Sequence, residues 1–177
     1  MRSLLVLAAA AALSTACGPS RPTVATAAPT GPSRQTAPAA PAIDVGAYAA
    51  ADSVVTVHTL EEATALAQAG GKRILMVFAG SDWCAPCKVF KRSVLTDAAF
   101  LDAGKDDYVV VYLDFPSKKR NQLPAEEKAY NDSLAETYNP QGVFPRIFLL
   151  DEDGATIREV KFQGQSATEF VEELETS

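Results

Sequence analysis

The sequence has few of the residues that bind metal ions. Its 177 residues include one histidine, two methionines and three cysteines. A structural zinc ion takes four Cys or His ligands, and beside the pair Cys84 and Cys87 the chain offers only His58 and the distant Cys17. A copper-handling role for the pair would need additional His or Met ligands. We therefore expect no metal site and no other cofactor.

Positive charge is in the minority. Lys and Arg number 16 against 22 Asp and Glu, so the net charge is -6. An acidic chain gives no reason to expect nucleic acid as a partner. One basic cluster, Lys118-Lys119-Arg120, falls in an expected loop between acidic elements. We expect this cluster to be a solvated loop rather than an anion site.

The apolar run at the N-terminus is short. It extends from Leu4 to Leu13, follows the positively charged Arg2, and cannot span a bilayer as a helix. Such a run is typical of a secretory signal peptide, which we assign to residues 1–16. Residues 17–46 begin with Cys17 and are rich in Pro, Ala and Thr. They cannot bury a core and are expected to form a disordered linker before a folded domain over residues 47–177.

The chemistry of the chain centres on Cys84-Ala85-Pro86-Cys87. An apolar run, 74–79, precedes these residues, and an amphipathic segment, 89–95, follows them. Two cysteines at this spacing, where a strand passes into a helix, are typical of a thiol–disulfide redox pair. The N–H groups at a helix N-terminus stabilise a thiolate, so Cys84 is predicted to attack and Cys87 to resolve. A structurally inert pair is the alternative.

The sequence from Trp83 to Lys88 resembles the thioredoxin active site, with Ala85 where thioredoxin has glycine. The resemblance extends from about Val54 to the C-terminus. It implies that Trp83, Pro86 and Lys88 support the redox pair.

The resemblance also concerns Pro145, which falls where thioredoxin-like proteins carry a cis-proline facing the active site. It implies that the backbone of Phe144, next to Pro145, binds an extended substrate segment. Two positions depart from the family pattern. Phe78 replaces a buried acid that moves the proton of the resolving thiol, and Arg146 follows the proline where threonine is common.

The residues before Cys17 resemble the lipobox of bacterial lipoproteins, in which the cysteine is lipidated and becomes the mature N-terminus. Ser14 stands where that family prefers leucine, with Leu13 one place earlier. Lipidation would leave an even number of thiols in an oxidising compartment. The alternative is cleavage further along, after residues 25–27, which would give a soluble exported protein.

The pattern of the folded domain predicts the order β-α-β-α-β-α-β-β-α, which resembles the complete thioredoxin fold. The expected class is α/β, with a central mixed sheet flanked by helices. The first three strands, joined by crossovers, should be parallel, and the last two should form a hairpin around residues 151–154. The apolar run from Val143 to Leu150, which contains Pro145, is the expected strand before that turn. Residues 59–62 and 166–169 have the composition of capping boxes.

These patterns together predict an enzyme of the cell envelope. We expect a thiol–disulfide oxidoreductase, monomeric and anchored to the membrane by lipid on Cys17, facing the periplasm or the extracellular side. Its expected partners are protein or peptide disulfides and dithiols and an unidentified envelope redox partner. Ala85-Pro86 resembles the reducing members of the family, which favours a reductase. The alternative is a non-catalytic module that binds extended or unfolded polypeptide.

Overall fold

The computed structural model describes residues 53–176. The predicted signal peptide, the linker and Cys17 lie outside these residues. Within the described range no helix is both long and apolar enough to cross a membrane.

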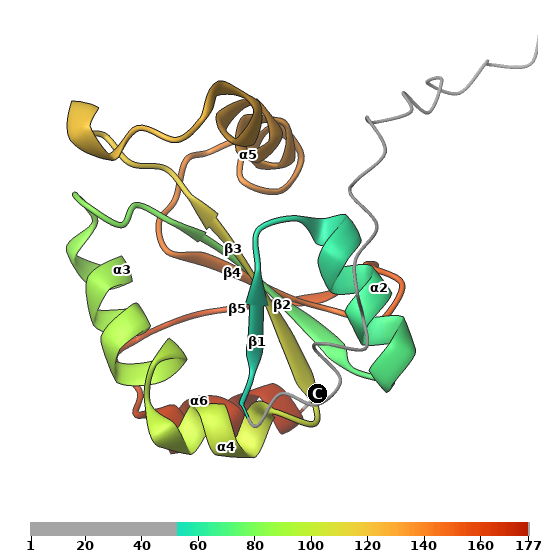
Figure 1. The fold of residues 1–177 in the computed structure, drawn as a ribbon. Helices are drawn as coiled ribbons and strands as arrows, with labels where there is room; N and C mark the ends of the chain where they lie inside the picture. The colour runs from blue at the N-terminus through green and yellow to red at the C-terminus, as the bar shows by residue number, and fades with distance from the viewer. Residues whose placement is uncertain (1–52, 177) are drawn as a thin grey trace, which may run out of the picture. The chain divides into compact units, whose positions relative to one another are not determined.

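A five-stranded mixed sheet forms the centre of the domain, as the sequence predicted (Figure 1). Its order is β1-β3-β2-β4-β5. Strands β1 and β2 run parallel to β3, whereas β4 runs antiparallel to both β2 and β5. The strands are β1 Val55–Val57, β2 Arg73–Ala79, β3 Tyr108–Asp114, β4 Arg146–Leu150 and β5 Thr156–Val160.

Strand β2 lies between two neighbours and is almost entirely buried. Residues 74–79 are apolar and at most 1% exposed. Because successive side chains of a strand point to opposite faces, Val77 contributes to one core cluster and Phe78 to the other. A continuous apolar run is what a strand covered on both faces requires.

The helices cover the two faces of this sheet (Figure 1). Helices α3, α4 and α6 supply apolar side chains to the cluster that contains both cysteines. Helix α2 supplies buried apolar side chains to the cluster on the other face, and partly buried side chains of α5 pack against that cluster. The helices are α2 Leu60–Gly70, α3 Ala85–Phe90, α4 Ala98–Gly104, α5 Ala125–Tyr138 and α6 Ala167–Glu175, with a π-helical turn Lys91–Leu95 after α3 and a 3-10 turn Lys119–Asn121 before α5.

Local hydrogen bonds determine where these helices begin. The Thr59 hydroxyl accepts from the Glu62 amide at the start of α2, and Asp97 accepts from the Ala99 amide at the start of α4. Ser166 and Glu169 form the complete reciprocal capping box of α6, as predicted. These bonds satisfy amides that the first helical turn leaves without intrahelical partners.

Strand β4 starts later than the sequence suggested. We expected a strand from Val143, but β4 begins at Arg146, directly after Pro145. Proline has no N–H to donate to a neighbouring strand. Residues 143–145 therefore form a connection that leads into β4, beside β2.

We predict that Ser166→Ala lowers the free energy of unfolding by about 1 kcal/mol, because it removes the acceptor for the Glu169 amide. Ser133→Ala is the matched control. Ser133 is exposed within α5 and donates only to the Tyr130 carbonyl, and alanine favours helix at such a position. Urea unfolding of both variants measures the difference. Equal stability of the two would contradict the role given to the capping box.

Candidate active site

Cys84 and Cys87 form a disulfide at the N-terminus of α3. Their Cα atoms are 5.3 Å apart, within the usual range for a disulfide. Cys84 is the N-cap residue, and its sulfur accepts a hydrogen bond from the Cys87 amide at 3.2 Å. The same amide can stabilise a thiolate at Cys84 once the disulfide is reduced.

The two sulfur-bearing residues differ slightly in access to solvent. Cys84 is 4% exposed and Cys87 is 1% exposed. Pro86 occupies the first turn of α3, where a missing N–H costs no intrahelical hydrogen bond. Both residues are thus buried in the disulfide form, and Cys84 is the less buried of the two. A pair of this kind can attack through one sulfur and release the product through the other.

Trp83 forms one wall beside the disulfide. Its indole Nε1 donates to the Phe115 carbonyl at 2.7 Å, and its ring meets the Phe144 ring edge-on with centroids 5.3 Å apart. Gly80 makes this position possible, because a Cβ on Gly80 would lie 2.4 Å from the indole. Although it is fixed on both sides, Trp83 remains 47% exposed.

Asp82 connects the turn before Cys84 to the loop after β3. Its carboxylate accepts from the amides of Ser117 and Lys118 and from the side chain of Asn121, at 2.9 to 3.0 Å. These bonds, led by the one from Ser117, lower the pKa of Asp82 to about 2 despite partial burial. Lys88 donates to the Asp82 carbonyl at 3.0 Å, so the start of α3 is tied to the same turn.

A second carboxylate strengthens this connection. Asp114, the last residue of β3, accepts from the amide of Ser81 at 2.8 Å and from its hydroxyl at 2.5 Å. Strands β2 and β3 are parallel neighbours, so their carboxyl ends lie at one edge of the sheet. The turn that carries the disulfide is therefore held against the segment that follows β3.

The bond between Phe144 and Pro145 is a cis peptide bond, as the resemblance implied. Phe144 contacts both Trp83 and Phe115 through its ring, which places this segment beside the redox pair. Arg146 has structural partners: its guanidinium donates to Gln141 and pairs with Glu159 at 3.2 Å.

Phe78 puts an apolar side chain where the family resemblance implies a buried acid. Phe78 is fully buried and packs against Phe115, Tyr138 and Phe148. Among residues 53–176 the buried polar or charged residues are Asn131 and Asn139. Proton transfer to and from Cys87 therefore has no buried acid available in the described part of the chain.

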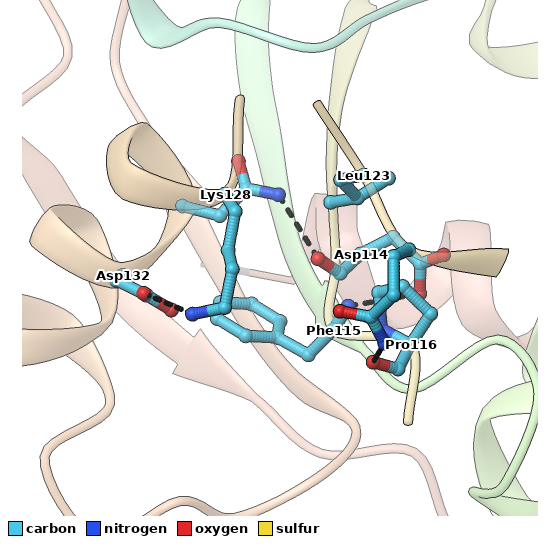
Figure 2. A pocket seen from close by; sticks show the side chains of 8 residues that line it. Asp114, Phe115, Pro116, Leu123, Lys128 and Asp132 are labelled. Carbon is cyan, nitrogen blue, oxygen red and sulfur yellow. Dashed lines mark hydrogen bonds and ion pairs between the residues drawn. The ribbon is translucent and has the colours of Figure 1, made fainter. Parts of the chain in front are cut away.

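A separate pocket of about 200 Å³ lies between the loop after β3 and α5 (Figure 2). Asn131 lines it and donates to the Asp114 carbonyl, while Lys128 and Asp132 form an ion pair on α5. None of its lining residues belongs to the disulfide or the cis-proline segment. In the described part of the chain no group of three His, Cys, Asp or Glu residues could hold a metal ion.

Comparison with known proteins places this architecture in a family. The model of a family described as thioredoxin-like matches residues 55–152. The chain belongs to the thioredoxin-like family. The matched range contains the disulfide and the cis-proline.

Individual relatives agree with this assignment. The chain is 27% identical over 106 residues to a disulfide bond reductase, DsbH, of Chlamydia pneumoniae, an alignment that covers 60% of this chain and 62% of the relative. The chain therefore matches less than two thirds of the length of that protein. A solved structure of a DsbH oxidoreductase superposes with a TM-score of 0.62 and 24% identity, covering 70% of this chain and 83% of that one. This likeness supports the fold.

The structure brings the predicted site residues together. Trp83, Cys84, Pro86 and Cys87 lie on one turn and helix start, and Phe144 reaches them through its contact with Trp83. Sequence reasoning missed Asp82, Asp114 and Gly80. The hydrogen bonds of Asp82 and Asp114 join residues more than 30 positions apart in sequence, so no local sequence pattern predicts them. Gly80, which follows the apolar run, was the one sequence signal available for these three residues.

We predict that brief iodoacetamide treatment of the reduced protein labels Cys84 in preference to Cys87. Cys84 is the more accessible thiol, and the amide of Cys87 stabilises its thiolate. Mass mapping of the labelled peptides measures the label on each cysteine. The variants Cys84→Ser and Cys87→Ser, which each keep one of the two thiols, serve as references. Preferential labelling of Cys87 would reverse the two roles.

Proposed function

We propose that the protein is a thiol–disulfide oxidoreductase of the cell envelope that acts mainly as a reductase. The observation that carries this proposal is the disulfide at the N-terminus of α3, with an amide directed at the Cys84 sulfur and exposed apolar side chains around it. The likeness to a disulfide bond reductase supports the direction, as does the sequence Ala85-Pro86 between the cysteines.

The proposed cycle starts from the dithiol. The Cys84 thiolate attacks one sulfur of a substrate disulfide, and the other substrate sulfur leaves as a thiolate that takes up a proton. Cys87 loses its proton and attacks the Cys84 sulfur, which releases the second substrate thiol and forms the Cys84–Cys87 disulfide. Two electrons pass to the substrate. A dithiol partner in the envelope restores the reduced pair by the reverse exchange.

The substrates proposed are disulfides of proteins or peptides. Phe144 lies beside Trp83, and its backbone precedes the cis-proline, where an extended segment could add as a strand. The same surface would serve a module that binds polypeptide without redox chemistry. Loss of activity on removal of a single sulfur distinguishes the two functions.

We predict that the wild-type protein accelerates reduction of insulin by dithiothreitol and that Cys84→Ser abolishes the acceleration. Reduced Cys87→Ser, mixed with insulin after dithiothreitol has been removed, should instead accumulate a mixed disulfide, because the resolving thiol is absent. Turbidity and non-reducing electrophoresis record the two outcomes, and equilibration with glutathione gives the direction of electron flow. Wild-type protein with no more activity than Cys84→Ser would support the binding module instead.

Cys17 is proposed to carry lipid that anchors the monomer to the membrane, after removal of residues 1–16. A lipid anchor on a linker would leave the folded domain free to meet its substrates in the envelope. A lipidated Cys17 would carry no free thiol and would therefore take no part in the exchange reaction.

We predict that Cys17→Ser moves the protein from the membrane fraction to the soluble envelope fraction and leaves insulin reduction unchanged. The acyl chains are the proposed source of membrane affinity. Fractionation of cells that express wild type and Cys17→Ser, with immunodetection, measures the change. Wild-type protein found in the soluble fraction would favour cleavage after residues 25–27.

A further inference from the structure

The loop between β3 and α5 is hydrogen-bonded to the turn that precedes the disulfide. Residues 116–122, here called the basic loop, are bonded to Asp82 through two amides and one side chain. Asp82 is two residues before Cys84, which corresponds to about 7 Å of chain. Figure 1 shows this loop, which follows β3, above the turn that leads into α3. The sequence had suggested only a solvated loop.

The charge of the basic loop is not balanced by ion pairs. Lys118, Lys119 and Arg120 are exposed. The Asp82 carboxylate lies close enough to Lys118 for the two charges to interact. Over residues 53–176 the ion pairs join Lys128 to Asp132 and Arg146 to Glu159. Lys119 and Arg120 thus present positive charge on a protein whose net charge is -6.

Exposed apolar side chains accompany this charge. Trp83, Val89 and Val143 are 47%, 39% and 52% exposed. They belong to the segments that carry the disulfide or the cis-proline. An apolar centre with a charged rim is the usual composition of a protein–protein contact surface. Rim charges act mainly on the rate and selectivity of association.

We propose that the basic loop docks acidic residues flanking the cysteine of an extended polypeptide substrate, while the apolar side chains contact the residues next to that cysteine. This inference rests on the proposed function and names the class of substrate that it prefers. Asp82 acts as a positioning residue, because its carboxylate bonds the loop that carries these cations to the turn before Cys84. Selectivity should be strongest at low salt, where charges within about 10 Å interact with little screening.

The first experiment measures binding without redox chemistry. Three short peptides carry serine in place of the substrate cysteine and differ only in two flanking residues, which are Asp, Ser or Lys. Trp83, the single tryptophan of the chain, reports their binding to the full-length oxidised protein by fluorescence. The Asp peptide is expected to bind at least ~3-fold more tightly than the Ser peptide at low salt, in the range of surface ion pairs. High salt should remove the difference.

Charge reversal locates the effect. Lys119→Glu and Arg120→Glu should each reduce the preference for the Asp peptide by about 3-fold, and the double variant should favour the Lys peptide. Lys105→Glu is the control, because it makes the same change in net charge. Lys105 precedes the first residue of β3, whereas the basic loop follows the last one. An equal effect of Lys105→Glu, or equal binding of the three wild-type peptides, would overturn the proposal.

The second experiment separates this proposal from the proposed function. The same peptides, now with cysteine in intermolecular disulfides, are reduced by the wild-type protein with dithiothreitol as the source of electrons, and kcat/KM is measured for each. Faster reduction of the Asp peptide supports both proposals. Equal reduction of all three overturns the docking proposal and leaves the reductase standing. Charge-selective binding without reduction of any peptide supports docking and rejects the reductase.

Discussion

The hydrogen bonds that Asp82 accepts are the contact on which the arrangement of the site depends. They join the turn before Cys84 to a loop more than 30 positions later in the chain. Because the acceptor is a carboxylate and two donors are backbone amides, the contact is both charge-assisted and directional. The disulfide, Trp83 and the basic loop consequently keep one geometry relative to each other.

This contact is possible because of the order of the strands. Strand β2 lies between β3 and β4, so the turn at its carboxyl end meets the end of β3 on one side and the start of β4 on the other. The disulfide follows β2, the basic loop follows β3, and Pro145 precedes β4. Three segments distant in sequence thereby reach one edge of the sheet, as expected where parallel strands end together.

The sequence was sufficient where the signal is local. The apolar run of β2, the cysteine spacing and the capping residues each act within a few positions, and the existence and order of the strands, the disulfide pair and the start of α6 were predicted correctly. The start of β4 was misplaced because the apolar pattern continues across Pro145. The role of Asp82 was missed because two of its partners are backbone amides of a loop. Every residue except proline has such an amide, so the residue types do not show which amide is bonded.

The replacement of a buried acid by Phe78 has a physical explanation in the same region. Phe78, Phe115, Phe144 and Trp83 form a connected series of ring contacts with centroid distances of 5.3 to 6.2 Å. A carboxylate at position 78 would be desolvated among these rings, at a cost that only a compensating partner could offset. The phenylalanine instead extends the core up to Trp83. Phe78 therefore supports the packing of the rings beside the disulfide. The proton of Cys87 must then be transferred by groups nearer the solvent.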